Sequence, residues 1–364
     1  MSASPVDERT QYGGQAVVEG VMMRSPRFFA IACRRLSDHQ IVTTLEPVEK
    51  HLKAFQWLNK PFLRGSLALV DAMALGIKAL TYAANVQATD EYAKNEAAAA
   101  GAAGMAMGEG IPTAGTWPPK PTADESASAA NGTINGIAIG ATTVLSLFLG
   151  FALFWTFPAL LTDKLLPHHN RLVSNLTEGG IRLAIFFIYI GLISQMKHIQ
   201  RVFQYHGAEH KAINTLERGV PMTVENARDS SRIHPRCGTN FIFIVLITSI
   251  VVFSIVPRHA FSEGIVPVLS TVFYRLLLLP IVAGVAYEIL KWAGSNRDKA
   301  WAQALIAPGL WTQYLTTRVP DDSQLEVAIA SLDAVWAKEH DGLGIVVSKR
   351  RPDTIGDGSE PVIA

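Results

Sequence analysis

The sequence contains little cysteine and little charge, and it lacks the common nucleotide-binding motifs. Two cysteines in 364 residues are too few for the disulfide framework of a small secreted protein. The paired glycines Gly13 and Gly14 do not have the G-x-G-x-x-G spacing, and no P-loop occurs. The N-terminal stretch MSASPVDERTQYGG is polar and has no apolar core of a cleavable signal peptide. A net charge of +1 provides no general attraction for nucleic acid, so we expect no nucleic-acid partner.

Hydrophobic residues are correspondingly abundant. They reach 49% of the chain against 17% for charged residues, and the mean hydropathy is +0.22, which is typical of membrane proteins. Two runs, Gly136 to Leu161 and Cys237 to Pro257, contain no charge. A helix needs about 20 residues to cross a bilayer core of roughly 30 Å, and each run is at least that long. We predict four membrane spans, at about residues 136–161, 181–199, 238–257 and 266–290.

The second and fourth predicted spans contain charged residues near or within their apolar cores. The second has a short uncharged core between Arg182 and Lys197, whose side chains would have to extend towards the two interfaces. Arg275 interrupts the fourth span, where a charge is costly, and if buried it would have to pair with another helix. Glu288, at the edge of the same span, can reach the interface by extending its side chain.

Lysine and arginine are distributed unevenly between the loops. They are concentrated in a predicted hairpin, residues 200–237, between the second and third spans, whereas the loops on the opposite side carry few. Because Lys and Arg favour the cytoplasmic side, we expect the hairpin and both termini in the cytoplasm. The expected partner is the lipid bilayer of the cytoplasmic membrane.

The expected fold class is mainly α. We predict a multispanning membrane protein with about four transmembrane helices, a small N-terminal α+β cytoplasmic module and a C-terminal cytoplasmic helical segment. In the module, residues 28–36 and 40–48 predict an antiparallel meander, and residues 61–91 predict either a core helix or an amphipathic helix on the membrane. In the C-terminal segment, Asp322 or Ser323 would cap a helix. The expected boundaries are 1–94 for the module, 95–133 for an Ala/Gly/Pro-rich linker, 134–292 for the membrane domain, 293–340 for the C-terminal segment and 341–364 for a mobile tail.

The hairpin contains the stretch YHGAEHK, residues 205–211. On a helix, His206 and His210 lie one turn apart with Glu209 beside them. The pattern H-x-x-E-H is the reversed form of a zinc-peptidase motif, in which both histidines bind the metal and the glutamate acts as base. The alternative is a pair of interfacial histidines at the end of the second span.

A second stretch, IHPRCGTN, follows a short turn and adds His234 and Cys237. Imidazole and thiolate are the ligands that zinc prefers, so we predict a divalent-metal site, with zinc as the metal. The predicted ligands are His206, His210, His234 and Cys237, with Glu209 as the catalytic residue. The alternative is that His234 caps a turn and Cys237 packs at the top of the third span. Arg218 and Gly219 would end the first helix of the hairpin, and Thr223 would cap a short second helix.

Glu19, in the N-terminal stretch YGGQAVVEGVMMRSP, has two interpretations. It is either a distant metal ligand or, as the residue type favours, a surface or ion-paired glutamate.

Five blocks together resemble one known family. In chain order they are GGQAVVEGVMMRSP, PFLRGSLAL, YHGAEHKAIN, TVENARDSSRIHPRCGTNF and PGLWTQYLTTRVPDDSQLEVAIASL. They are similar to the YqhQ-like bacterial membrane proteins, the domain of unknown function 1385, and the similarity extends from about Gly13 to Leu332. The resemblance implies a multispanning protein of the bacterial inner membrane and supports metal dependence. It implies no substrate.

Two functional hypotheses follow. In the first, the protein is a cytoplasm-facing metal-dependent enzyme, most simply a hydrolase, in which the metal activates water and Glu209 takes the proton. In the second, a closed structural metal site anchors cytoplasmic segments for a protein partner, and the protein is not an enzyme. Transport ranks last, because the sequence lacks the broken or repeated helices typical of transporters.

Overall fold

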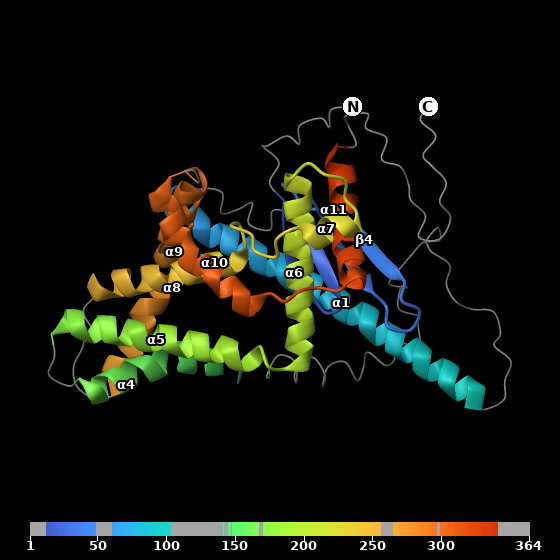
Figure 1. Ribbon diagram of the computed structural model, residues 1–364. Helices are drawn as coiled ribbons and strands as arrows, with labels where there is room; N and C mark the ends of the chain where they lie inside the picture. The colour runs from blue at the N-terminus through green and yellow to red at the C-terminus, as the bar shows by residue number, and fades with distance from the viewer. Residues whose placement is uncertain are drawn as a thin grey trace.

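The computed structural model contains a small sheet packed between helices and a separate group of apolar helices (Figure 1). The predicted tail 341–364 and the part of the predicted linker from 103 to 133 lie outside the described residues, whereas residues 95–102 continue a helix. The structure describes residues 12–48, 60–102, 141, 145–146, 148–166, 170–255, 265–296 and 299–340.

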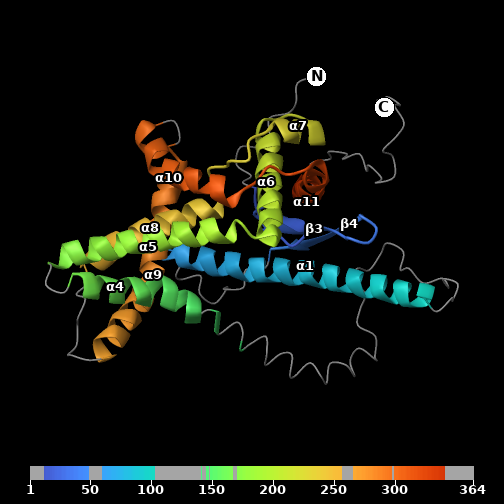
Figure 2. The ribbon, with the colours of Figure 1, turned by 60° about the horizontal axis from the view of Figure 1, so that its bottom comes forward.

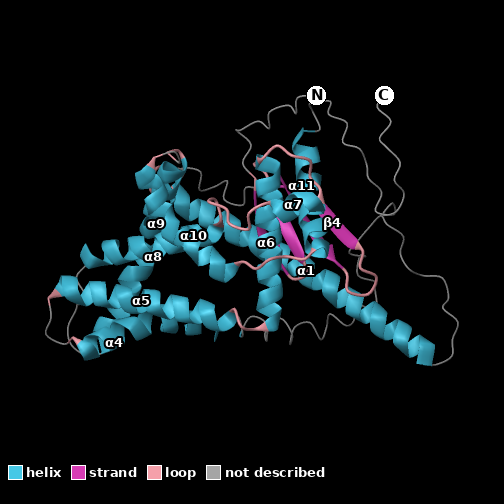
Figure 3. Ribbon diagram, in the orientation of Figure 1, coloured by secondary structure: helices cyan, strands magenta, loops and turns pink. Residues whose placement is uncertain are grey.

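The sheet is antiparallel, with strand order β1-β2-β3-β4. Figure 3 shows its strands in magenta among the helices. Its strands are β1 Gly13–Val17, β2 Gly20–Arg24, β3 Phe28–Arg34 and β4 Ile41–Pro47. The predicted meander is confirmed as β3 and β4, and two further strands come from the glycine-containing N-terminal stretch. The middle of β3 is buried at every position rather than at every second one, because helices cover both faces of the sheet.

Helix α1, Arg64–Ala102, covers one face of the sheet (Figure 2). Small and apolar side chains on one side of α1 pack against the strands: Leu75, Ala79, Ala83 and Val86. The core-helix interpretation of residues 61–91 therefore holds for this side. The other side exposes Val70, Met73, Ile77 and Leu80. The segment Arg64–Glu91 is also long and apolar enough to cross a membrane, although its second half lies against the sheet.

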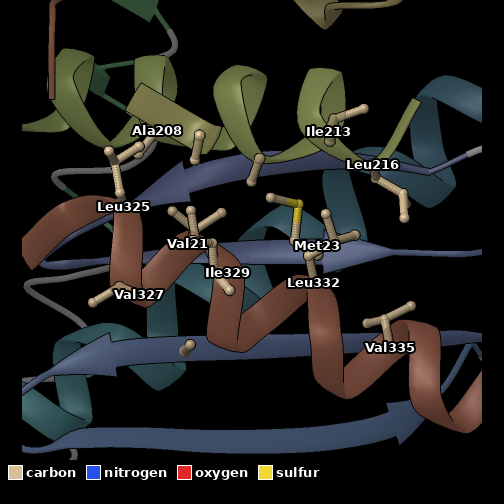
Figure 4. Packing of buried hydrophobic residues seen from close by; sticks show 14 of the residues in the cluster. Val21, Met23, Ala208, Ile213, Leu216, Leu325, Val327, Ile329, Leu332 and Val335 are labelled. Atoms are coloured by element: carbon tan, nitrogen blue, oxygen red, sulfur yellow. The ribbon is translucent and has the colours of Figure 1, made fainter. Parts of the chain in front are cut away.

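Helices α6, Lys197–Glu217, and α11, Asp322–His340, cover the opposite face (Figure 4). Each fully buried aliphatic side chain in this core contributes about 1.5–3 kcal/mol relative to exposure. The cap of α11 is Asp321, one residue earlier than predicted, because its carboxylate accepts from Gln324 N while Gln324 Oε1 accepts from Asp321 N. The core contains Val21, Met23, Ala208, Ile213, Leu216, Leu325, Val327, Ile329, Leu332 and Val335.

The separate group consists of apolar helices. They are the π-helical turn η2 Ala152–Thr156, α4 Phe157–Leu165, α5 Arg171–Ile193, α8 Gly238–Ile255, α9 Ile265–Gly294 and α10 Ala300–Thr316. Among the described residues, four helices are long and apolar enough to cross a membrane: Arg64–Glu91, Phe148–Leu165, Leu172–Ile193 and Phe273–Gly294. Three of these overlap predicted spans. The predicted third span forms the shorter apolar helix Gly238–Ser254. The remaining helix of sufficient length, Arg64–Glu91 in α1, was not among the predicted spans.

The predicted second span, 181–199, is corrected in two ways. Helix α5 begins ten residues earlier, at Arg171, and ends at Ile193, while Lys197 opens α6, which crosses the direction of α5 in Figure 1. The Arg182 side chain does not extend to an interface. It is 2% exposed and its Nη2 lies 2.7 Å from Glu178 Oε1.

Arg275 of α9 completes this buried cluster, as expected for a buried charge that needs a partner on another helix. Its Nη2 donates to Glu178 Oε2 at 2.8 Å. Arg182 Nε also donates to the carbonyl oxygen of Phe154, which lies in a π-helical turn of the chain. The guanidinium of Arg182 lies 4.9 Å from the Trp155 ring centroid. These contacts tie α5, α9 and η2 together inside the apolar group.

Glu288 also differs from the prediction. Its carboxylate does not simply extend to an interface but pairs with Arg64 at the start of α1, with Nη2 2.5 Å from Oε2. Close packing accompanies this pair, since a Cβ on Gly284 of α9 would collide with Phe62 O. The beginning of α1 is thereby fixed to α9.

Candidate metal centre

The hairpin after α6 folds as the sequence predicts. Helix α6 ends at Glu217, with Gly219 at φ 67°, and α7, Val224–Asp229, is capped by the Thr223 side chain. The returning chain then runs beside α6. Lys211 Nζ donates to Ser230 O at 2.5 Å, and Asn214 Nδ2 donates to Ile233 O at 3.1 Å. These bonds bring the IHPRCGTN stretch onto the histidine side of α6.

Three predicted ligands meet there. The ligand atoms of His206, His210 and Cys237 all lie within 4.8 Å of one another. His206 Nε2 is 3.2 Å from Cys237 Sγ, and the two imidazole rings are 4.4 Å apart between centroids. His210 and Cys237 are buried, whereas His206 is partly exposed. The group is thus enclosed but reachable on the His206 side.

Backbone carbonyls orient both imidazole rings. His206 Nδ1 lies 2.9 Å from Thr316 O, and His210 Nδ1 lies 2.6 Å from Arg232 O. A carbonyl oxygen only accepts hydrogen bonds, so each Nδ1 carries the hydrogen and each Nε2 presents a lone pair. Metal-binding histidines commonly donate their second ring N–H to a carbonyl in this way. Burial also lowers the pKa of His210, which favours the neutral, ligating form.

The group fits a metal ion on a further observation. His210 Nε2 is buried and makes no hydrogen bond of normal geometry among the described residues, although the Cys237 side chain lies close to the ring. A buried polar atom without a partner costs about 1–3 kcal/mol, so such atoms are rare unless an ion or a water satisfies them. The Nε2 lone pair faces the same space as Cys237 Sγ and His206 Nε2.

His234 lies beside this group but not in it. Its ring centroid is 5.9 Å from that of His210, and its Nε2 is 3.5 Å from Glu217 Oε1. The backbone of His234 is held by Gln313 of α10, whose Oε1 accepts from His234 N at 2.9 Å and whose Nε2 donates to His234 O at 2.8 Å. Both residues are buried.

Glu209 is buried on α6 and faces the sheet. The backbone N–H of Gly14 on β1 donates to its carboxylate. A Cβ on Gly14 would lie 3.0 Å from the Glu209 carboxyl carbon, so glycine permits this close approach. Burial raises the pKa of Glu209, and this effect is opposed by His206, by His234 and by the Gly14 hydrogen bond.

Glu19 is the ion-paired glutamate that its residue type favours. Its carboxylate accepts from Arg201 Nη2 at 2.6 Å and from Tyr205 Oη at 3.2 Å, both on α6. Glu19 has φ 51° in the turn between β1 and β2. The pair fastens this turn to α6 one helical turn before His206.

Sequence reasoning missed the segment that connects α10 to α11. Thr316 supplies the carbonyl behind His206, and Arg318 N donates to Phe203 O at 2.8 Å. The connector lies so close to α6 that a Cβ on Gly207 would collide with Arg318 O. Two signals were present in the sequence: the glycine inside YHGAEHK and the block PGLWTQYLTTRVP, which carried no assigned role.

Comparisons with known proteins agree with the family resemblance. A family model described as "Protein of unknown function (DUF1385)" matches residues 60–338. The chain is 33% identical over 330 residues to "Uncharacterized protein YqhQ" of Bacillus subtilis (strain 168), an alignment that covers 90% of this chain and 93% of the relative. No solved structure matches the chain.

Proposed function

The chain belongs to the DUF1385 family of proteins of unknown function, and we propose that it is a metal-dependent membrane enzyme, most simply a hydrolase. The observation that carries the proposal is the group of His206, His210 and Cys237, whose ligand atoms lie within 4.8 Å of one another. Imidazole nitrogen and thiolate sulfur are both ligands that zinc prefers, so zinc is the proposed metal.

The number of ligands favours catalysis over a structural role. Catalytic zinc sites have three protein ligands and an open fourth position, whereas structural sites have four protein ligands. A divalent ion at this group would supply Lewis acidity towards water or a polarised substrate oxygen. His234 is the residue that would close the site if its side chain turned towards the group. A closed site would favour the second candidate function, a structural centre that anchors a cytoplasmic partner.

Glu209 is the proposed base. It lies on the same helix as His206 and close enough for that histidine to lower its pKa, and the Gly14 N–H donates to its carboxylate. A carboxylate in this position would accept a proton from the attacking water. Gly14 then acts as a positioning residue, because its hydrogen bond orients the carboxylate without touching the substrate.

The proposed location is the bacterial cytoplasmic membrane, with several spans and both termini in the cytoplasm. The charge distribution supports this orientation, since Lys and Arg are concentrated between α5 and α8. The metal group lies in this same segment, so the reaction would take place on the cytoplasmic side.

Metal analysis of detergent-purified protein tests the proposal. We expect about one equivalent of zinc in the wild type and in Glu209→Gln, and its loss in His206→Ala and Cys237→Ser. His198→Ala is the matched control, because His198 is an exposed histidine on the same helix. Equal metal content in His206→Ala and His198→Ala would reject the site.

A further inference from the structure

Helix α10, Ala300–Thr316, contains no charged residue. Its inner side is buried against α8 and α9 and carries Gln313 and Thr316, the two residues that hold the backbone of His234 and the ring of His206. Its outer side is exposed and includes Gln303 besides large apolar and aromatic side chains: Trp301, Leu305, Trp311, Tyr314 and Leu315. An outer helix face without charge is unusual for a helix in contact with water.

The position of α10 in the chain places it next to a candidate span. The span Phe273–Gly294 ends five residues before α10, and the Trp292 ring stacks on the Trp301 ring with 4.0 Å between centroids. Trp311 is 67% exposed and Tyr314 is 59% exposed. Tryptophan and tyrosine are enriched where a membrane meets water, because their rings are apolar and their N–H or O–H groups are polar.

Cations lie at both ends of this aromatic face. Lys291 and Lys299 flank the corner between α9 and α10, and the Arg232 guanidinium lies 5.5 Å from the Tyr314 ring centroid. Basic residues at this depth interact with lipid phosphates. An uncharged face with aromatic rings and flanking cations is typical of a helix at a membrane interface and not of a helix that faces water.

We propose that α10 lies in the interfacial layer of the bilayer, with the face of Trp301, Leu305, Trp311, Tyr314 and Leu315 against lipid. The helix does not cross the membrane, since its 17 residues include Pro308 and its inner side carries buried polar groups that bond the hairpin. It lies on the membrane as a monotopic helix does. The proposal is independent of whether a metal binds at His206.

Lipid is a better occupant of this face than a second copy of the chain. The face continues directly from a candidate span through the Trp292–Trp301 stack, so a membrane around α9 would reach it without another partner.

Fluorescent labelling in vesicles tests the proposal. Trp311→Cys and Leu315→Cys, each labelled with the polarity-sensitive dye NBD, are reconstituted into vesicles of phosphatidylcholine and phosphatidylglycerol with or without a lipid carrying a nitroxide near its head group. Asp229→Cys, at the exposed end of α7, is the matched control. Unsubstituted protein gives the background, because both natural cysteines are buried. Both substituted side chains are exposed, and equal elution and melting temperature show that the variants fold.

We expect blue-shifted emission at Trp311→Cys and Leu315→Cys and nitroxide quenching several-fold stronger than at Asp229→Cys. Quenching equal to that at Asp229→Cys would place the face in water and overturn the proposal. Blue-shifted emission that is not quenched, and that disappears when the ratio of protein to lipid is lowered, would instead identify a second copy as the occupant and also overturn it.

Discussion

At the residue scale, the candidate metal group depends on hydrogen bonds made by backbone and side-chain groups of residues that do not belong to it. The His206 and His210 rings are fixed by two carbonyls, and the loop that carries Cys237 is fixed by Gln313. Such supporting residues commonly change metal affinity when they are replaced, although they do not touch the ion.

Replacing Gln313 tests this dependence. Gln313→Ala leaves His234 N and O without their side-chain partner, and we expect a metal affinity roughly 10–100-fold lower. Competition with a chromophoric chelator measures the affinity. Gln303→Ala, on the exposed side of α10, is the matched control. Unchanged metal affinity in Gln313→Ala would show that the hydrogen bonds between Gln313 and His234 have no influence on the group.

The sequence predicts that YHGAEHK and IHPRCGTN come together. The first follows one predicted span and the second precedes the next at the same interface, and the turn between them is short. The supporting residues were not predictable. Gln313 is 79 residues from His234, and Thr316 is 110 residues from His206. Arg182 was misplaced for the same reason, since its cluster includes Arg275, which bonds Glu178 across 97 residues.

At the element scale, α1 joins the sheet to α9, and α6 joins the sheet to the candidate metal group. Helix α6 packs on the sheet through Ala208 and Ile213, and the connector before α11 crosses it at Gly207. The strands β1 and β2 were missed in the sequence because helices bury both faces of the sheet, which removes the alternation that marks a half-exposed strand.

Replacement by alanine is expected to change the stability in opposite directions at Gly207 and at Gly191. Gly207→Ala would place a methyl group against Arg318 O, and we expect it to destabilise the protein by about 1–3 kcal/mol. Gly191→Ala on α5 has open space around its added methyl group, and alanine is favoured over glycine in a helix by about 0.5–1 kcal/mol. Thermal unfolding in detergent compares them. Stability in Gly207→Ala that is unchanged or raised, as expected for Gly191→Ala, would contradict the close approach.

At the scale of the whole molecule, the charges of the loops predict an orientation in the membrane. The segment between α5 and α8 is rich in Lys and Arg, and it also contains the metal group. Four described helices can cross a membrane by length and composition, but those properties alone do not give a direction.

Cysteine labelling provides the direction. We expect Arg218→Cys to react with a membrane-impermeant maleimide only after permeabilisation, because positively charged loops stay in the cytoplasm. Asn170→Cys, at the start of α5, should react in intact cells. Labelling of both from the same side would mean that α5 does not cross the membrane.

The connector over Gly207 also determines when the site can form during synthesis. The carbonyl that holds the His206 ring belongs to Thr316, which leaves the ribosome 110 residues later, a delay on the order of 10 s at usual elongation rates. By then α8 and α9 have already been translated. If the chain inserts as it is translated, the His206 ring gains its supporting carbonyl only after α8 and α9 have left the ribosome, and any metal loading is expected to be a late event.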